Sequence, residues 1–582
     1  MRKDVEERAL MYAAKNAIDY GTANANAVLG KVLAYFPELK ADVKGTATEI
    51  AQIVERINKM SRSEIEELYG KGYEANKEML EKREQEKLEK SAKPNIAIET
   101  SSGSIATRFA PEPSGYMHIG HAKAAFVASE IAKKYSGKIF LYFDDTNPEK
   151  ELQEYVDAIK RDLDWLGVKF DDEYYASDNI DKLYYYAENL IKKGAAYVCL
   201  CTTDTIKENR KNMRECEHRR QSVNENLELW KKMLNDAFED NVAVLRFKGD
   251  MKAQNTVMRD PTLFRIKHHA HYRQGNKYKV WPTYDFNTPI NDSLHGVSDA
   301  IRSKEYELRD ELYYRILDEL ELRKPKIHSF SRLEILDNTT KKREINQLVA
   351  KGLISGYDDP RLVTISGLRR RGIAPEAIKR FVLRFGLSKV ESKVKIDMLL
   401  SENRKIIDPV SKRLFFVAEP VMVKVMGIDK LKVSIPLHPQ NDMGNREYVI
   451  GNTLYISKND ASALKPGEIV KLKDAYDIEV EKVDATITAK YVERGNADAK
   501  RIQWVDEGNF TNATLLVPGD LIVEGKFNPE SLKRVPGYVE KYAEQLGVNE
   551  VVQFERVGFA KLDDKEKMVF IGLLYGSKRF WI

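Results

Sequence analysis

The chain has 582 residues, of which 42% are hydrophobic and 32% charged, and its net charge is +5. A chain of this length is expected to form roughly three to five domains with well-buried cores. No apolar run approaches the ~18 residues of a membrane span, which excludes an integral membrane protein. The beginning, MRKDVEERAL, is too charged for a secretory signal, and three cysteines are too few for a disulfide scaffold. We therefore expect a cytoplasmic protein.

The first 73 residues have the pattern of packed helices. Apolar residues recur at helical spacing in 28–36 and again in 50–57, and Ser61 and Glu64 are spaced as a capping box. Residues 74–94 are nearly all polar and carry both charge signs, which fits either an exposed helix or a linker. We predict a helical accessory domain with its linker over 1–95, and its sequence indicates no chemistry.

From residue 101 the pattern changes to alternating strands and helices. Strands are predicted over 104–110 and 138–143, with a helix over 121–135 between them. This βαβ unit predicts parallel strands joined by a right-handed crossover. The second strand ends at Asp144 and Asp145, at the edge where open parallel sheets bind ligands.

Further along the chain, the alternation stops and later resumes. Residues 199–280 are irregular, as an inserted domain would be, whereas 281–330 again resemble the core and 341–400 look helical. After about 405, runs rich in valine and isoleucine alternate with Gly, Pro, Asn and Asp. That rhythm predicts an all-β domain of one or two barrels.

The most informative segment is RFAPEPSGYMHIGH, residues 108–121. It places turn-forming residues, His118, Gly120 and His121 between a predicted strand and a predicted helix. In that setting the backbone N–H groups at a helix N-terminus can face a phosphate chain, and glycine allows a close approach. A bare strand–turn–helix is common, but the full fourteen residues are far more specific.

This segment resembles the HIGH signature of class I aminoacyl-tRNA synthetases, in the glutamyl/glutaminyl branch. Four further segments agree with that family in the same order, and the resemblance covers most of residues 100–582. They are FDDTNP at 143–148, WPTYDF at 281–286 with the stretch through Arg302 and Tyr306, SFSRLEI at 329–335, and GYDDPRLVTISGLRRRG at 356–372.

The resemblance implies a multidomain α/β and all-β fold. It places a Rossmann catalytic core in two halves at 96–200 and 281–335, separated by an acceptor-binding insert at 201–280. A KMSKS-like loop and helical stem-contact domain would occupy 336–404, and a β-barrel anticodon-binding domain 405–582. A β-rich tail of this kind marks the archaeal/eukaryotic glutamyl enzymes and the glutaminyl enzymes.

The activity implied is adenylation of an amino acid by ATP, with Mg²⁺, followed by transfer to tRNA. Such catalysis consists of positioning and of stabilising charge on phosphate oxygens. By resemblance, the catalytic residues are His118, His121 and Lys342. The ATP site would also include Glu112, Pro113, Ser114, Gly120, Arg332 and Leu333, the last two framing the adenine.

The mobile lysine loop departs from the family pattern. Ten residues after Arg332 the chain reads Thr339-Thr-Lys-Lys-Arg343, where this branch usually has Met-Ser-Lys-Arg. Lys342 keeps the cation that neutralises the leaving pyrophosphate, while Lys341 replaces the serine. We expect an active enzyme whose loop closure and rate are altered. The alternative is a solvated run of charges.

The amino acid is indicated by Arg302, where glutaminyl enzymes carry a small uncharged residue. A guanidinium can donate charge-assisted hydrogen bonds to the γ-carboxylate of glutamate, and glutamine would leave that cation unpaired. Arg108 resembles the second carboxylate-binding arginine, Asp144 the α-ammonium ligand, and Tyr284 a side-chain contact. The alternative for Arg302 is a surface salt bridge with Glu305 or Glu307.

Two other groups of residues predict binding sites. All three cysteines lie close to one histidine in a CxC…CxH pattern that suits tetrahedral Zn²⁺ and resembles a zinc site of some glutamyl synthetases: Cys199, Cys201, Cys216 and His218. The alternative is a set of buried unreactive cysteines. Arg369, Arg370 and Arg371 form a basic cluster predicted to meet tRNA phosphates. For His268, His269 and His271 we expect an RNA-contacting surface rather than a metal site.

The resemblance therefore implies a monomeric, cytoplasmic glutamate–tRNA ligase that uses ATP, Mg²⁺, L-glutamate and tRNA(Glu), with structural zinc. Whether tRNA(Gln) is also a substrate stays open. The first alternative is a glutaminyl-tRNA synthetase, which shares the fold and most motifs. The second is a non-catalytic tRNA-binding paralogue, supported only by the altered lysine loop.

Overall fold

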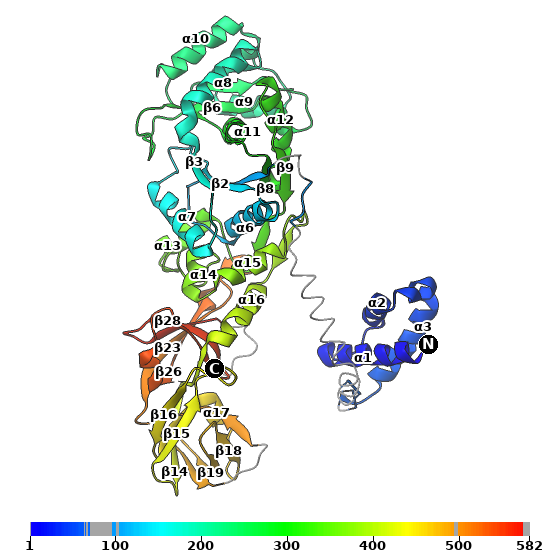
Figure 1. The fold of residues 1–582 in the computed structure, drawn as a ribbon, viewed down its shortest axis with the longest axis vertical. Coiled ribbons are helices and arrows are strands. Elements are labelled where there is room, and N and C mark those ends of the chain that lie inside the picture. The colour runs from blue at the N-terminus through cyan, green and yellow to red at the C-terminus, as the bar shows by residue number, and fades with distance from the viewer. Residues whose placement is uncertain are drawn as a thin grey trace. The chain divides into compact units, whose positions relative to one another are not determined.

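The computed structural model describes residues 2–62, 64–65, 68–69, 96–99, 104–493 and 499–573, and Figure 1 shows their fold. The chain divides into two compact units, Met1–Lys93 and Pro94–Ile582. The exposed helix or linker predicted for 74–94 lies outside the described residues. Among those that are described, no helix combines the length and apolar character needed to cross a bilayer.

The first unit is helical, as its sequence pattern predicts. It contains α1 (Lys3–Tyr20), α2 (Ala25–Tyr35), the 3₁₀ helix η1 (Pro37–Asp42) and α3 (Val43–Asn58). The apolar residues of 28–36 and 50–57 supply much of its core. At the predicted capping box, the Ser61 N–H donates to Glu64 at 2.7 Å, and the Glu64 N–H faces the Ser61 hydroxyl at 3.4 Å.

The described part of the second unit begins its sheet with the predicted βαβ unit. Strands β1 (Ala106–Phe109), β2 (Lys138–Phe143) and β3 (Asp172–Tyr175) form a parallel sheet, and α6 (Ile119–Lys134) connects the first two. Strands β8 (Asp299–Ser303) and β9 (Lys326–Phe330) also pair in parallel. The Ser298 N–H donates to the Ala106 carbonyl at 2.9 Å, so β8 continues beside β1.

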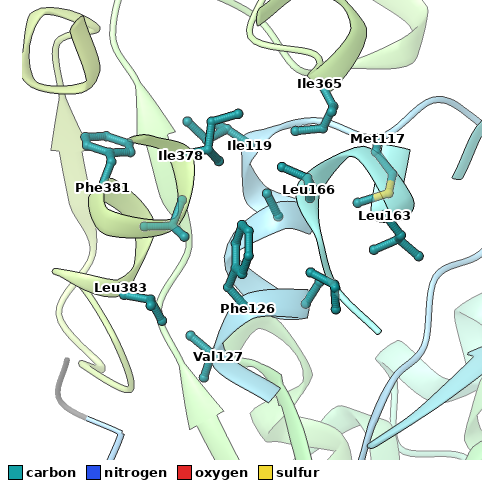
Figure 2. Close-up of a cluster of buried hydrophobic side chains, with 14 of the residues drawn as sticks. Met117, Ile119, Phe126, Val127, Leu163, Leu166, Ile365, Ile378, Phe381 and Leu383 are labelled. Atoms are coloured by element: carbon teal, nitrogen blue, oxygen red, sulfur yellow. The ribbon is translucent and has the colours of Figure 1, made fainter. Parts of the chain in front are cut away.

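Helix α6 and the turn that precedes it pack into a shared hydrophobic core, and this packing fixes the turn. Figure 2 shows Met117, Ile119 and Phe126 packed with side chains from α7 (Gln153–Leu166), α14 (Ile365–Arg371) and α15 (Pro375–Leu383). These side chains are almost completely buried. Burying a large aliphatic or aromatic side chain contributes about 1.5–3 kcal/mol, so this cluster anchors the start of α6 firmly.

The insert is a four-stranded antiparallel sheet covered by helices. Its strand order is β4 (Ala196–Cys199), β5 (Val244–Phe247), β6 (Thr262–Ile266) and β7 (Val280–Pro282). The sheet therefore extends a few residues outside the expected 201–280. The helices of this region are α8 (Ile180–Lys192), α9 (Thr203–Lys211), α10 (Val223–Leu234), α11 (Tyr284–Leu294) and α12 (Asp310–Glu319), with 3₁₀ turns η2 (Ala176–Asn179), η3 (Glu217–Arg220), η4 (Thr256–Met258) and η5 (Lys304–Arg309).

The region after β9 is mainly helical. Strand β10 (Leu333–Ile335) pairs in parallel with β11 (Ser392–Val394). Helices α13 (Lys342–Ala350), α14, α15 and α16 (Asp397–Ile407) make up most of the rest, followed by η6 (Asp408–Val410). Helix α15 lies against α6, which joins this helical region to the predicted nucleotide site.

The remaining part is all-β, as the valine-rich pattern predicts, and it forms two seven-stranded sheets with separate cores. One sheet has the order β12-β27-β28-β29-β23-β26-β13 and the other β21-β18-β19-β20-β14-β17-β22. The bounds are β12 (Lys412–Leu414), β13 (Phe416–Ala418), β14 (Pro420–Met426), β15 (Leu431–Pro436), β16 (Asn445–Ile450), β17 (Thr453–Ser457), α17 (Lys458–Ala463), β18 (Ile469–Leu472), β19 (Asp477–Val483), β20 (Ile487–Val492), β21 (Lys500–Ile502), β22 (Val505–Asp506), β23 (Phe510–Pro518), β24 (Ile522–Val523), β25 (Lys526–Phe527), η7 (Pro529–Ser531), β26 (Leu532–Glu540), η8 (Lys541–Gln545), β27 (Val551–Phe554), β28 (Gly558–Asp564) and β29 (Val569–Gly572).

Candidate active site

The two histidines of the HIGH-like segment form the start of helix α6. His118 is the N-cap residue, and its Nδ1 accepts from the Gly120 N–H at 3.0 Å. The His118 N–H in turn donates to Nδ1 of His121 at 3.2 Å, and the two rings lie 4.0 Å apart. Because each Nδ1 accepts a backbone N–H, the proton of each neutral ring is assigned to Nε2. Both histidines therefore present Nε2–H as the donor for a ligand.

Burial keeps these two rings uncharged at neutral pH. It lowers the pKa of His121 to about 4, and it lowers the pKa of His118 well below its usual value, with smaller contributions from His121 and Arg332. The pair can donate hydrogen bonds to phosphate oxygens but brings no positive charge. Cationic stabilisation at this site has to come from other residues.

Packing, as well as access for a nucleotide, requires a glycine between the two histidines. A Cβ atom at Gly120 would lie 2.8 Å from Cε1 of His118. The His118 ring therefore occupies the space that any larger residue at 120 would need. The sequence pattern, in which Gly120 only lets the backbone approach a ligand, does not reveal this contact.

Lys342 lies against the HIGH-like turn although it is 228 residues from Ser114 in the chain. Its Nζ donates to the Ser114 carbonyl and lies 4.5 Å from the centre of the Tyr155 ring. Lys341 behaves differently, since it is exposed and forms an ion pair with Glu344 at 2.8 Å. Both side chains are exposed, but only Lys342 contacts the HIGH-like turn, a contact that a solvated charge run does not predict.

The loop before α13 compensates for the missing serine. The Thr339 hydroxyl accepts from the Lys341 N–H at 3.2 Å and donates to Glu344 at 2.5 Å. Serine is a favoured helix N-cap, whereas the lysine that occupies this cap makes no side-chain hydrogen bond to the helix N–H groups. Thr339 thus supplies part of the bonding lost with the serine.

The other predicted nucleotide contacts differ in exposure. The Arg332 side chain is largely exposed and lies 3.4 Å from Glu305, whereas Leu333 is 4% exposed within the hydrophobic core. Leu333 can reach a ligand only through its main chain. Glu112 is exposed, and Pro113 is buried with its carbonyl accepting from the Leu152 N–H at 3.2 Å.

Arg302 is buried at the end of β8, where it is only 5% exposed. Its Nη2 donates to Asp310, and its guanidinium lies 5.1 Å from the centre of the Tyr313 ring. The nitrogens Nε and Nη1 are buried without a hydrogen-bond partner among the described residues. A surface salt bridge to Glu305 or Glu307 is wrong, because those carboxylates pair with Arg332 and Lys389.

Arg108 is held much more completely by the protein. Its Nε and Nη2 donate to the two oxygens of Asp292 at 2.9 and 3.1 Å, and Nη1 donates to the Ile301 carbonyl at 2.7 Å. Each of its nitrogens has a partner within the chain, in contrast to those of Arg302. Of the two arginines, Arg302 is therefore the one with free donors for a substrate carboxylate.

Asp144 and Tyr284 lie in the same cluster. Asp144 accepts from the Asn287 amide at 2.6 Å, and burial, reinforced by Glu112 and Asp145, raises its pKa to about 7. Burial also raises the pKa of Tyr284, against the opposing influence of Arg302 and Arg108. The Tyr284 ring lies 4.7 Å from that of Tyr306.

Several partners in this cluster were missed by sequence reasoning: Asn287, Asp292, Tyr306, Asp310 and Tyr313. A partial signal was present in the sequence of α11, where amides and a carboxylate alternate with apolar residues, and the structure buries them. A helix that buries amides and a carboxylate has to pair them, which marks the partner positions as part of a polar site.

The cysteine pattern folds into one compact cluster. The Sγ atoms of Cys199 and Cys216 are 3.8 Å apart, and Sγ of Cys201 is 3.5 Å from Nδ1 of His218. All four ligand atoms lie within 4.8 Å of one another, as tetrahedral metal coordination requires. Arg246 approaches the sulfurs of Cys199 and Cys216 at 3.8 and 3.9 Å, and its charge favours thiolates, although the hydrogen bond with Cys216 and burial raise the pKa of Cys199.

Two of the predicted RNA-contacting groups need correction. His271 is 2% exposed, with its Nε2 3.5 Å from a Glu151 oxygen, so it does not belong to a surface. His268 instead contacts Asp236 and Asp240. The burial of His271 and the acidic partners of the exposed His268 contradict the simple picture of a basic RNA-facing strip.

The three arginines at 369–371 also differ in their exposure and partners. Arg369 is exposed, Arg370 pairs with Asp358 and Asp563, and Arg371 is 3% exposed. Burial lowers the pKa of Arg371 to about 10. The expectation that all three face tRNA phosphates is therefore corrected for Arg371, which lies inside the helical region.

Comparison with known proteins agrees with this geometry. Residues 104–409 match the catalytic domain of class I tRNA synthetases (E and Q), and residues 411–498 and 501–563 match two anticodon-binding domains of the same group. A glutamate–tRNA ligase of Nitrosopumilus maritimus is 39% identical over 98% of this chain and 100% of its own. One of Pyrococcus abyssi is 39% identical over 98% and 99%.

Among solved structures, a glutamate tRNA ligase from Elizabethkingia meningosepticum matches 53% of this chain and 70% of its own at 19% identity, with a TM-score of 0.40. The sequence matches run through the catalytic and both anticodon-binding regions, and the archaeal relatives align over nearly their whole length. The chain therefore belongs to the class I tRNA synthetases of the glutamate and glutamine branch.

Proposed function

We propose that this aminoacyl-tRNA ligase is a glutamate–tRNA ligase, which joins L-glutamate to tRNA(Glu) at the expense of ATP. The observation that carries the proposal is that the buried Arg302 has two unpaired guanidinium nitrogens and lies near Tyr284, which in turn lies near Asp144. A γ-carboxylate can accept hydrogen bonds from those nitrogens, whereas a glutamine amide brings no negative charge. The archaeal relatives are glutamate–tRNA ligases as well.

The geometry supports distinct tasks for the two ends of the site. Arg302 and Tyr284 would orient the side chain of glutamate, and Asp144 its α-ammonium group, while Arg108 supports this pocket through Asp292. The α-carboxylate then attacks the α-phosphorus of ATP and pyrophosphate leaves. His118 and His121 donate Nε2–H to phosphate oxygens, and Lys342 supplies positive charge for the leaving group.

Mg²⁺ would enter with ATP and neutralise phosphate charge during the first step. Contacts of the nucleotide with Glu112, Pro113, Ser114, Gly120, Arg332 and Leu333 belong to the proposal. The proposal also includes the domain division, with core halves at 96–200 and 281–335, an insert at 201–280, a loop and stem-contact region at 336–404 and an anticodon domain at 405–582. It further includes a cytoplasmic, monomeric state. Of the predicted tRNA contacts, Arg369 and Arg370 are retained.

The glutaminyl alternative is disfavoured by the charge at position 302. A buried guanidinium with only one carboxylate partner favours an anionic substrate over a neutral one. The non-catalytic alternative is disfavoured by Lys342, whose ammonium group contacts the Ser114 carbonyl in the HIGH-like turn despite the altered loop.

Aminoacylation with labelled amino acids tests the proposal directly. Purified protein with ATP, Mg²⁺ and tRNA(Glu) is expected to attach glutamate and to leave glutamine at background. Parallel reactions with tRNA(Gln) determine whether that tRNA is also a substrate. Attachment of glutamine in preference to glutamate would establish the glutaminyl alternative, and no attachment of either would establish the non-catalytic one.

Glutamate capture is expected to weaken as the pH falls below about 7. Protonation removes the negative charge with which Asp144, whose pKa is about 7, would attract the α-ammonium group. The value of kcat/KM for glutamate should therefore fall about tenfold for each pH unit below that pKa. Steady-state kinetics across the range measure it.

The control for this prediction is Asp144→Asn, which should be slow and should lose the pH dependence. Asp145 lies beside it, and burial raises its pKa to about 7 too. An unchanged profile in Asp144→Asn would assign the titration to Asp145 instead and contradict the ammonium role of Asp144.

We further propose that Cys199, Cys201, Cys216 and His218 hold a structural Zn²⁺ ion. Three thiolates and an imidazole are a typical zinc set, and Tyr197 and Arg246 support it from outside: the Tyr197 hydroxyl is 3.6 Å from Cys216 Sγ and donates to Asp260. A bound ion would tie the end of β4 to η3, and so stabilise the insert.

Protein purified without added metal is expected to contain about one zinc per chain. Elemental analysis measures this directly. Cys216→Ser should lose most of the metal and melt at a lower temperature, whereas the exposed His269→Asn serves as a control that keeps it. Less than about a tenth of an equivalent in the unmodified protein would refute the zinc proposal.

A further inference from the structure

Three tyrosines lie together next to the lysine of the proposed site, and one of them, Tyr155, contacts its ammonium group. Tyr116 lies in the HIGH-like turn, Tyr155 in α7, and Tyr357 just before α14. The Tyr116 ring meets Tyr155 edge-on at 5.3 Å and lies 4.5 Å from Tyr357. We call Tyr116, Tyr155 and Tyr357 the tyrosine cluster. Its members come from three separated segments, so their convergence is a product of the fold.

The lysine loop is attached to this cluster at two points. Nζ of Lys342 lies 4.5 Å from the centre of the Tyr155 ring, within the range of a cation–π contact. The Tyr357 hydroxyl donates to Asn346, one turn further along α13, at 2.7 Å. The cluster therefore contacts both the ammonium group and the helix that carries it.

In the part of the chain that the structure describes, the partners of the Lys342 ammonium group are uncharged. Its hydrogen-bond partner is the neutral Ser114 carbonyl, and its stem passes Gly115, where a Cβ would lie 3.6 Å from Lys342 Cδ. Among the described residues no carboxylate forms an ion pair with Lys342. The face of the Tyr155 ring and one carbonyl thus hold a cation that stays free to meet an anion.

The altered sequence of the loop explains why the contact between Lys342 and Tyr155 would matter. The serine expected before the lysine is replaced by Lys341, whose side chain turns to Glu344 and contributes nothing to holding Lys342. A different element has to limit the many conformations of a long exposed lysine side chain, and the Tyr155 ring is placed to do so.

We propose that Tyr155 is a positioning residue for Lys342, which keeps the ammonium group beside the HIGH-like turn until the ATP phosphates arrive. This inference rests on the proposed function, because it requires Lys342 to act on the leaving pyrophosphate. In this role Tyr155 contacts Lys342 rather than the reacting atoms. Its effect on rate should therefore pass through Lys342.

The test is single-turnover glutamylation of tRNA at saturating glutamate and varied ATP. Tyr155→Leu keeps an apolar side chain but removes the ring face, and it should lower the maximal rate about fivefold, while half-saturation by ATP changes less than about twofold. Tyr155→Phe keeps the ring and should restore the rate. Tyr185→Leu, at a position 62% exposed on α8, is the matched control.

A double-mutant cycle with Lys342→Met separates positioning from a general structural role. Once Lys342 is gone, Tyr155→Leu should cause no further loss of rate. An additional fivefold loss in that background, or a Tyr155→Phe variant as slow as Tyr155→Leu, would overturn the inference. A single Lys342→Met variant with full activity would instead contradict the catalytic lysine of the proposed function, so the two failures are distinguishable.

Discussion

Replacing Arg302 by alanine is expected to lower kcat/KM for glutamate by about 100- to 1000-fold, which corresponds to about 3–4 kcal/mol of lost transition-state stabilisation. The side chain is 5% exposed, and its removal leaves Asp310 and the substrate γ-carboxylate without their shared cation. The two carboxylates would then repel each other. Aminoacylation kinetics with varied glutamate measure the effect.

The binding of tRNA should be unaffected by this substitution, because Arg302 is buried in the proposed amino acid pocket. Arg315→Ala is the matched control: Arg315 is on α12, its side chain is 58% exposed, and it pairs with Glu319. That variant should retain its activity. A normal kcat/KM for glutamate in Arg302→Ala would reject the assignment of the substrate.

The second large effect is expected for Lys342→Met, with a fall in the rate of glutamyl-adenylate formation of about 100-fold. Methionine keeps much of the side-chain length but removes the ammonium group. Because burial keeps His118 and His121 uncharged, the two histidines cannot replace the lost positive charge. Rapid-quench measurements in the presence of tRNA follow this step.

Lys341→Met provides a close control, since it removes the neighbouring charge from the same loop. Lys341 is exposed and bonded to Glu344, so its loss should change the rate less than about threefold. Equal rates for the two variants would show that the loop acts only through its total charge. The particular role given to Lys342 would then be wrong.

The sequence predicts the framework well because its local signals agree with the fold. Strands 104–110 and 138–143 with the helix between them, and the valine-rich pattern after 405, each carry their own periodicity and turn residues. The cysteine cluster is predictable for the same reason, since Cys199, Cys201, Cys216 and His218 lie close together along the chain and are residue types that bind zinc, although their spacing is narrower than the common CxxC.

The partners of charged residues were much harder to predict. Arg302 stands out in the sequence, but its contact with Asp310 rather than Glu305 or Glu307 depends on how η5 turns into α12. Arg371 and His271 look like surface residues in the sequence and are buried in the structure. Their burial follows from packing between distant segments, which a hydrophobicity pattern does not encode.

The lysine loop illustrates the same limit. Thr339-Thr-Lys-Lys-Arg343 reads as a degraded motif, yet Thr339 replaces part of the lost cap and the Tyr155 ring lies beside the ammonium group of Lys342. Both compensations involve contacts that no spacing rule reveals. A motif can thus lose a residue from its consensus while the fold supplies the missing interaction from elsewhere.

A crystal structure of the protein with glutamate and a non-hydrolysable ATP analogue tests the assignment of the substrate most directly. The γ-carboxylate should lie within hydrogen-bonding distance of Nε or Nη1 of Arg302, with the α-carboxylate turned toward the α-phosphate beside His118 and His121. A ligand whose γ-carboxylate points away from Arg302, or whose α-carboxylate occupies that position instead, would contradict it.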